Sequence, residues 1–410
     1  MTSAVTVPAT PSTGVALDPE IRSPLAGRFE EALYNRVVGQ DQAVRAVSSL
    51  YEVALARLNS PSRPIGTMLL LGPTGCGKTR VAETAAEILF GSASALIRID
   101  CGEYQHPHEI AKLIGSPPGY VGHGETAPLL TQEGLDRQDR SGVKLALVLF
   151  DEIEKAAPVL WQLLLGVLDR GTLTLGDNRR VDFTRAIVMM SSNLGAADMS
   201  AILSGGVGFG ATAPSDGQRI EDQLQRAAIE AARRHFSPEF MNRIDKTVVF
   251  RALSHEHLGQ VLDLELRDVQ GRIHREGGTP FSFRCSDTVR ERLLHEGTDR
   301  RYGARHLRRA IDRLLVAPLA RLMTSGQVGV RDCIEIDLDA ESGSFVFTRR
   351  TAPDPDEPEQ PAGVAASPAV AMSDGRQMAM LVMATTVAVT AAVGVATGLA
   401  ASGLAARRRL

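Results

Sequence analysis

Eight residues, from Gly72 to Thr79, combine residue types and a spacing that suit them to holding phosphate groups. They follow the pattern G-x-x-x-x-G-K-[ST], and residues 67–71 before them are apolar or β-tolerant, as in a buried strand. Glycines permit a tight turn whose N–H groups point at phosphate oxygens, and a helix starting near Gly77 adds the positive end of its dipole. The pattern therefore predicts a nucleoside triphosphate site, with Lys78 at the β- and γ-phosphates and Thr79 at Mg²⁺. The predicted phosphate-binding residues are Gly72, Pro73, Thr74, Gly75, Cys76, Gly77, Lys78 and Thr79. A thiol at Cys76 could be oxidised there, although a small buried filler is the favoured interpretation.

Two carboxylates follow an uninterrupted apolar run at residues 145–150. Such a run predicts a buried strand that delivers Asp151 and Glu152 to its carboxyl end. Asp151 suits Mg²⁺, which prefers oxygen ligands, and Glu152 suits the role of general base towards a water molecule. Asn193 comes directly after another apolar run and can hydrogen-bond the same water. Without the other residues of the site, it would be interpreted as a turn residue at the end of a strand. Together with the glycine-rich loop, these residues predict hydrolysis of a nucleoside triphosphate with Mg²⁺ as cofactor.

Buried strands that alternate with helices predict an α/β fold, with a parallel sheet covered by helices on both faces. In this part we expect strands at 67–71, 95–100, 145–150 and 186–192, and helices within 25–58 (with a turn at 38–41), at 158–169 and at 218–236. From residue 255 the pattern changes to that of a small α+β lid domain. There we expect helices at 255–276, 286–296 and 304–325, and strands at 281–284, 332–338 and 344–348.

Composition and length limit the classes of function and the number of domains that this chain can have. The chain has 410 residues and a net charge of −3, which gives no electrostatic reason to expect a nucleic-acid partner. Its four cysteines are widely spaced, so neither a disulfide framework nor a zinc site is predicted, as expected for a cytoplasmic protein. The expected organisation is a disordered N-terminal tail at 1–24, a large ATPase domain at 25–252, the lid at 253–350, a disordered linker at 351–376 and a hydrophobic tail at 377–410.

The hydrophobic tail contains no charged residue from 378 to 404, and three arginines follow at 407–409. It is long enough to span a bilayer, so we expect membrane association through 378–404. Docking of the tail on a protein partner is the competing interpretation.

Seven stretches, in order along the chain, resemble the second nucleotide-binding module of the Clp-type AAA+ unfoldases ClpA, ClpB and ClpC. Besides the phosphate loop, they are Val37-Val38-Gly39-Gln40-Asp41, Gly119-Tyr120-Val121-Gly122, Phe150-Asp151-Glu152-Ile153-Glu154-Lys155-Ala156, Ser191-Ser192-Asn193-Leu194-Gly195, Pro238-Glu239-Phe240-Met241-Asn242-Arg243-Ile244-Asp245 and Tyr302-Gly303-Ala304-Arg305. The resemblance implies a P-loop AAA+ sheet sandwiched by helices, followed by a Clp-type C-terminal lid. It also implies polypeptide substrates and assembly as a homo-hexamer.

The resemblance implies a role for each matching position. Val37 and Val38 resemble the apolar contacts to adenine, and Asn193 resembles the sensor-1 residue. Arg243 looks like the arginine finger that completes a neighbouring subunit's site, and Arg305 resembles sensor 2, which reaches the γ-phosphate from the lid. Without the resemblance, either arginine would be read as a solvated charge on a helix surface.

The Gly-Tyr-Val-Gly segment resembles the family's pore loop, so Tyr120 and Val121 are expected to grip an extended polypeptide. An ordinary surface-turn tyrosine is the alternative. A further tripeptide, Val207-Gly208-Phe209, resembles the apolar loop that docks Clp ATPases on a ClpP-like peptidase, although a flexible surface loop explains it as well.

This sequence also departs from the large family members. Only a short tail precedes the module and no coiled-coil insertion is found, so we expect a single-ring form without ClpB-like rescue of aggregates. The predicted function is an ATP-dependent protein unfoldase or remodelling chaperone that threads polypeptide through a hexameric pore. The alternatives are a membrane-tethered, nucleotide-switched scaffold and a regulatory ATPase that delivers substrates to a ClpP-like peptidase.

Overall fold

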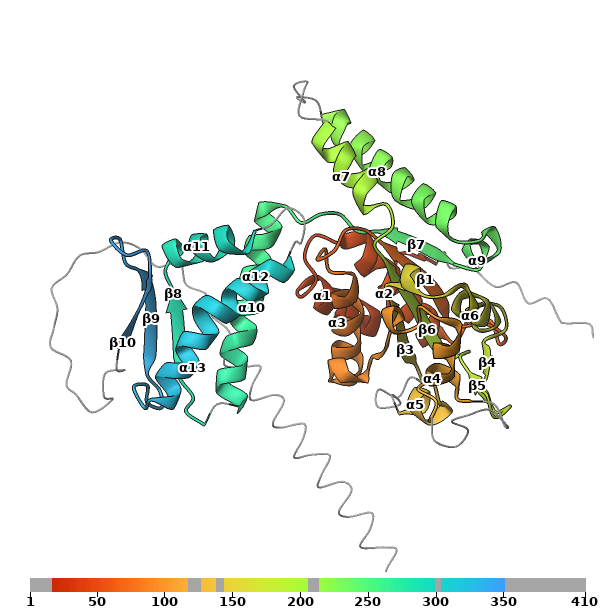
Figure 1. Cartoon of the computed structure of the whole chain (residues 1–410), viewed down its shortest axis with the longest axis horizontal. Coiled ribbons are helices and arrows are strands. Elements are labelled where there is room, and N and C mark those ends of the chain that lie inside the picture. The colour runs from red at the N-terminus through yellow and green to blue at the C-terminus, as the bar shows by residue number, and fades with distance from the viewer. Residues whose placement is uncertain are drawn as a thin grey trace, which may run out of the picture. The chain divides into compact units, whose positions relative to one another are not determined.

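The computed structural model of the chain describes residues 17–116, 127–137, 144–205, 214–276, 278–298 and 304–350. Figure 1 shows the elements with their labels. Those as far as β7 belong to a part built on a parallel sheet, and those from α10 onwards to a part with a smaller sheet of mixed direction.

The larger sheet has five strands in the order β2-β3-β6-β1-β7, and all neighbouring strands are parallel. Its strands are β1 (Gly66–Leu71), β2 (Ile97–Asp100), β3 (Ala146–Asp151), β6 (Ala186–Ser192) and β7 (Lys246–Val249). Parallel strands end at the same edge of a sheet, and here Leu71 pairs with Ser192, and Asp100 pairs with Asp151. The residues that follow β1, β3 and β6 therefore emerge side by side.

Alternate residues of the central strands face opposite layers of helices. In β1, Met68 and Leu70 belong to a core shared with α1, α2 and α3, whereas Leu69 and Leu71 belong to a core shared with α4, α5, α6, α8 and α9. Every residue of β1, β3 and β6 is buried, because helices cover both faces (Figure 1). The helices of this part are α1 (Pro24–Tyr34), α2 (Asp41–Ala56), α3 (Lys78–Phe90), α4 (Ile110–Ile114), α5 (Gln132–Asp136), α6 (Pro158–Arg170), α7 (Ala196–Gly205), α8 (Pro214–His235) and α9 (Pro238–Asn242). The predicted α/β sheet, sandwiched by helices, is confirmed.

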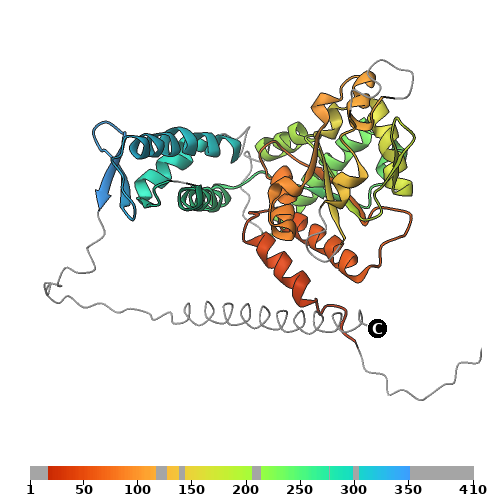
Figure 2. The same ribbon diagram turned by 90° about the horizontal axis from the view of Figure 1, so that it is seen from below.

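The second group of elements has its own hydrophobic core. Its sheet has the order β10-β9-β8, in which β9 is antiparallel to β10 and parallel to β8. Figure 2 shows its helices packed beside this sheet. The elements are α10 (His255–Glu276), β8 (Ser282–Cys285), α11 (Asp287–Gly297), α12 (Ala304–Ile311), α13 (Ala317–Thr324), β9 (Cys333–Leu338) and β10 (Phe345–Arg350). The α+β class expected for this part is confirmed.

The structure differs from the sequence-based expectation in several details. The helix expected at 304–325 is divided by a wider π-helical turn, Asp312–Val316, just before Pro318, which has no N–H to continue the regular pattern. The short hairpin of β4 (Thr172–Thr174) and β5 (Arg180–Asp182) was not predicted, because three-residue strands leave little periodicity to read. The edge strand β7 was also missed, because its four residues leave little periodicity to read.

Within the described residues, no helix has both the length and the apolar character needed to cross a bilayer. The N-terminal tail, the linker and the hydrophobic tail at 377–410 lie almost wholly outside those residues, so the predictions made for them stay predictions.

Candidate nucleotide-binding site

The glycine-rich loop between β1 and α3 has the backbone that its sequence requires. Gly72, Gly75 and Gly77 have φ values of 146°, 77° and 100°, a region that residues with a Cβ atom rarely adopt. Gly72 also lies close to its neighbours, since a Cβ atom there would be 2.6 Å from the carbonyl oxygen of Phe250. Gly77 then serves as the N-cap of α3, whose first residue is Lys78, so the positive end of the helix dipole faces the loop.

Lys78 is buried and is held by oxygen acceptors at the mouth of the loop. Its Nζ donates hydrogen bonds to the carbonyls of Gly72 (2.7 Å) and Pro73 (2.9 Å), and to Oδ1 of Asn193 (2.9 Å). Burial lowers the pKa of Lys78 from its ordinary value, and the positive charge of Arg305 acts in the same direction. An ammonium group in this position is suited to bind anionic oxygens.

Asp151, at the end of β3, collects donors from three other segments. Thr79 Oγ1 donates to it at 3.3 Å, Arg98 Nη2 from β2 at 2.6 Å, and Ser191 Oγ from β6 through a short hydrogen bond. The Asp151 side chain is only 8% exposed, whereas that of Arg98 is 47% exposed. The hydroxyl and carboxylate oxygens of Thr79, Asp151 and Ser191 are the hard ligands that Mg²⁺ prefers, so this donor set fits a magnesium ion.

Glu152 is held in an uncommon backbone conformation beside Asp151. Its φ is 56°, which for a residue with a side chain costs free energy and is found mainly where the surroundings enforce it. Its N–H donates to Ser191 Oγ at 3.0 Å, and its carboxylate accepts from Asn193 Nδ2 at 3.3 Å and pairs with Lys155. The hydrogen bond to Glu152 raises the pKa of Lys155. The Glu152 carboxylate thus lies between an amide donor and an ammonium group.

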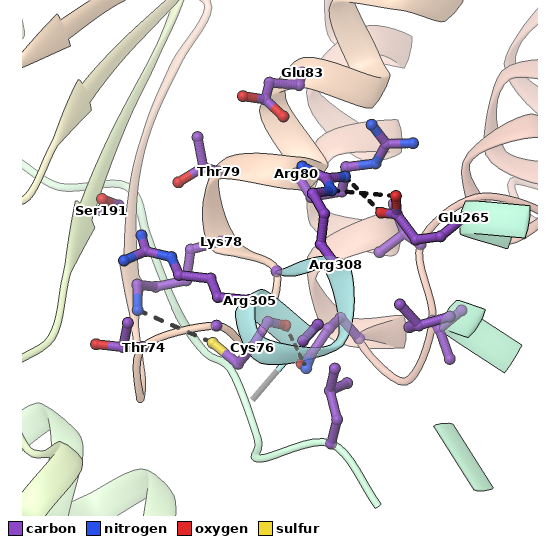
Figure 3. A pocket seen from close by; sticks show the side chains of 18 of the residues that line it. Thr74, Cys76, Lys78, Thr79, Arg80, Glu83, Ser191, Glu265, Arg305 and Arg308 are labelled. Carbon is purple, nitrogen blue, oxygen red and sulfur yellow. Dashed lines mark hydrogen bonds and ion pairs between the residues drawn. The ribbon is translucent and has the colours of Figure 1, made fainter. Parts of the chain in front are cut away.

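The side chains of the preceding paragraphs that line one cavity of about 430 Å³ are those of Lys78, Thr79, Arg98, Asp151, Glu152, Ser191 and Asn193. Val37 and Val38 form part of its wall, and neighbouring Gln40 binds the carbonyls of Cys76 (3.1 Å) and Arg251 (3.0 Å). Residues of α10 and α12 also contribute to the lining, and the N–H of Ala304 donates to the Gly75 carbonyl at 3.2 Å. Figure 3 shows the cavity with its ion pair between Arg308 and Glu265. Arg305 lies beside Lys78 in this view.

The structure brings most of the predicted site residues together. Among the predicted residues, those that line this cavity are Val37, Val38, Thr74, Gly75, Cys76, Gly77, Lys78, Thr79, Asp151, Glu152, Asn193 and Arg305, while the carbonyls of Gly72 and Pro73 hold Lys78. Arg243 is not part of the lining; its Nη1 pairs with Asp169 Oδ1 at 2.6 Å, at the end of α6. Tyr120, Val121, the tripeptide Val207-Gly208-Phe209 and the tail at 378–404 lie outside the described residues.

Four residues of the network were not predicted from the sequence. Arg98 and Ser191 contact Asp151, and Glu154 and Lys155 contact Asn193 and Glu152, respectively. Ser191, Glu154 and Lys155 were named only as members of matching motifs, without a role of their own. The sequence places Arg98 in a four-residue strand, β2, at a position exposed beside the buried Ile99. It does not show that β2 lies next to β3, which brings Arg98 to Asp151 and is decided by the fold.

Comparison with known proteins finds a matching family for each of the two parts of the chain. Residues 63–247 match the family described as AAA domain (Cdc48 subfamily), and residues 253–336 match the C-terminal, D2-small domain of ClpB protein. The chain is 38% identical to the chaperone protein ClpC3, chloroplastic, of Oryza sativa subsp. japonica, over 80% of this chain and 34% of the relative. It is 39% identical to the chaperone protein ClpB of Rhodopirellula baltica, over 78% of this chain and 34% of the relative.

Solved structures of Hsp104 have the same architecture. The S. cerevisiae Hsp104–ADP complex matches with a TM-score of 0.64 and 29% identity, over 78% of this chain and 52% of that chain. Hsp104 with ATPγS and FITC casein, in its closed state, matches with a TM-score of 0.64 and 27% identity, over 78% of this chain and 51% of that chain.

A P-loop parallel sheet followed by a small lid defines an AAA+ nucleotide-binding protein. More specifically, the chain belongs to the Clp-type AAA+ family, whose ClpB and ClpC members match both of its parts. It spans about a third of the length of the curated relatives it matches.

Proposed function

We propose that this chain is an ATP-dependent protein unfoldase of the Clp type, which assembles as a hexamer and threads polypeptide through its central pore. The observation that carries the proposal is the single network in which Lys78, Asp151, Glu152 and Asn193 meet at the edge of the sheet. Family membership supports the coupling of this site to work on polypeptides, because the relatives are chaperones.

In the proposed reaction, water attacks the γ-phosphorus of ATP, and the bond to the β,γ-bridging oxygen breaks to leave ADP and phosphate. Glu152 accepts the proton of the attacking water, and Asn193 orients that water through its side-chain amide. Lys78 and Arg305 face the negative charge of the phosphate oxygens, while Val37 and Val38 contact the adenine. Thr79 and Asp151 would hold Mg²⁺, which would neutralise charge on the phosphates.

Arg243 is proposed to act on a neighbouring subunit. It is separate from the cavity of its own chain, and its partner Asp169 is 41% exposed, so another anion can replace this carboxylate. An arginine supplied in trans stabilises charge on the transferred phosphoryl group, and hydrolysis would then require assembly.

The test uses Glu152→Gln and Lys78→Ala, assayed for binding of a fluorescent ATP analogue and for phosphate release. Glu152→Gln should bind nucleotide like the wild type and release at least about a hundredfold less phosphate, because an amide cannot accept the proton. Lys78→Ala should lose binding as well. Turnover by Glu152→Gln at the wild-type rate would refute the assignment of the base.

Threading is tested separately with Tyr120→Ala. The ATP-bound Glu152→Gln protein should retain fluorescein-labelled casein, a probe suggested by the Hsp104 complex, and the double variant should lose it. Tyr120→Ala alone should keep its ATPase activity. Unchanged casein retention in the double variant would remove the pore-loop assignment.

Two further associations stay predictions of the sequence. Docking on a ClpP-like peptidase through Val207-Gly208-Phe209 predicts that Phe209→Ala abolishes co-purification with such a peptidase. Membrane association through 378–404 predicts that the intact chain sediments with membranes in high-speed centrifugation, and its complete recovery in the supernatant would exclude this association. In either case the ATPase site is proposed to face the cytoplasm.

A further inference from the structure

Asn193 lies at the centre of the site, and its side-chain amide has opposite charges on its two sides. The oxygen Oδ1 accepts from Lys78 Nζ at 2.9 Å and from Thr74 Oγ1 at 3.4 Å. The nitrogen Nδ2 donates to Glu152 Oε1 and to Glu154 Oε1, each at 3.3 Å. Turning the amide over would place its oxygen against two carboxylates and its NH₂ group against an ammonium ion, so this orientation is fixed by charge.

Of the two carboxylates, Glu154 holds Asn193 more completely. Its Oε1 atom also accepts the backbone N–H of Asn193 at 3.0 Å, so one oxygen fixes both the main chain and the side chain of that residue. The other oxygen, Oε2, is buried without a hydrogen-bond partner among the described residues. A buried carboxylate oxygen without a partner costs free energy and calls for an explanation, which the hold of the other oxygen on Asn193 supplies.

The turn that carries Glu154 is itself fixed from the side away from the cavity. The indole Nε1 of Trp161, in α6, donates to the Ile153 carbonyl at 3.0 Å. His235, at the end of α8, lies with its Nε2 atom 3.3 Å from the Glu154 carbonyl oxygen, and its ring packs edge-on against that of Trp161. The position of the Glu154 carboxylate is therefore set by packing on two helices.

We infer that Glu154 is a positioning residue for ATP hydrolysis: it holds Asn193 with Oδ1 towards Lys78 and Nδ2 towards the attacking water. The inference rests on the proposed function and adds a residue to it. Glu152 cannot keep Asn193 in place by itself, because its carboxylate must turn to the water and change charge during the reaction. Glu154 keeps the amide oriented while that happens.

The test compares kcat and KM for ATP in the wild type, Glu154→Ala, Glu154→Gln, Asn193→Ala and the double variant with alanine at both positions. Glu154→Ala should lower kcat about tenfold, as expected for the loss of a charge-assisted hydrogen bond, and leave KM within about twofold. Glu154→Gln keeps an acceptor oxygen and should recover to within about threefold of the wild type. In the Asn193→Ala background, Glu154→Ala should cause no further loss, because the group it positions is already absent.

Trp161 is the only tryptophan of the chain, so its fluorescence reports whether the turn at Glu154 is intact in each variant. An unchanged emission spectrum in Glu154→Ala, together with the kinetic pattern above, supports positioning. Two results overturn the inference while leaving the proposed function in place: wild-type kcat in Glu154→Ala when Asn193→Ala is impaired, or a loss in the double variant equal to the product of the two single losses. Absence of ATPase activity in the wild type would overturn both the proposed function and this inference.

Discussion

Replacement of Arg98 by methionine tests whether its guanidinium group balances the negative charge of Asp151 when no Mg²⁺ is bound. The substitution keeps most of the length of the side chain and removes its charge. In the structure Arg98 Nη2 lies 2.6 Å from Asp151 Oδ2, and Asp151 is 8% exposed. A hydrogen bond between charged groups contributes about 1.5–3 kcal/mol, and the 47% exposure of Arg98 reduces this to about 1 kcal/mol through solvent screening.

The expected result is a difference that depends on bound nucleotide. Without nucleotide and Mg²⁺, Arg98→Met should lower Tm by about 2–4 °C, because Asp151 keeps a buried charge without its cation. With saturating ADP and Mg²⁺, the difference should fall below about 1 °C, since the metal then supplies the positive charge. Thermal unfolding followed by Trp161 fluorescence, with and without MgADP, measures both values.

The control is Arg179→Met, which removes an ion pair of similar length. Arg179 Nε lies 2.7 Å from Asp177 Oδ2 on the exposed β4–β5 hairpin, so its loss should change Tm by less than about 1 °C in either condition. A difference for Arg98→Met that stays constant or grows when MgADP binds would refute the reasoning, and so would no difference in the nucleotide-free protein.

Three further predictions follow from the structure. Gly72→Ala should abolish nucleotide binding and lower Tm in calorimetry, because its Cβ would lie 2.6 Å from the Phe250 carbonyl oxygen at a φ of 146°; Gly27→Ala, with no atom within 4 Å of the added Cβ, should not. Arg243→Ala should keep nucleotide affinity in a binding titration and lose about a thousandfold in ATP turnover, and equal turnover would contradict a role in trans. Burial raises the pKa of the Cys285 thiol from 9.0 to about 11, so the thiol favours the folded state below pH 9 and this contribution is lost as the pH rises towards 11. Unfolding curves of Cys285→Ala should therefore show a smaller loss of stability between pH 9 and 11 than those of the wild type, and parallel losses would argue against it.

The sequence by itself determined the fold class and the core of the nucleotide site. Both depend on local patterns: glycines where the φ values of the loop are positive, continuous apolar runs for strands buried on both faces, and carboxylates or an amide directly after those runs. Parallel strands bring their ends to one edge whatever their order, which is why the loop before Lys78, Asp151 and Asn193 could be grouped in advance.

Only the tertiary structure decided which charges pair with those residues. Strand order places Arg98 of β2 and Ser191 of β6 on opposite sides of Asp151, and α6 and α8 fix the turn that aims Glu154 at Asn193. The ion pair of Arg243 with Asp169 likewise joins positions 74 residues apart. Such pairs depend on distances between segments that no local periodicity encodes, because Coulomb interactions and hydrogen bonds follow separation in space and not in sequence.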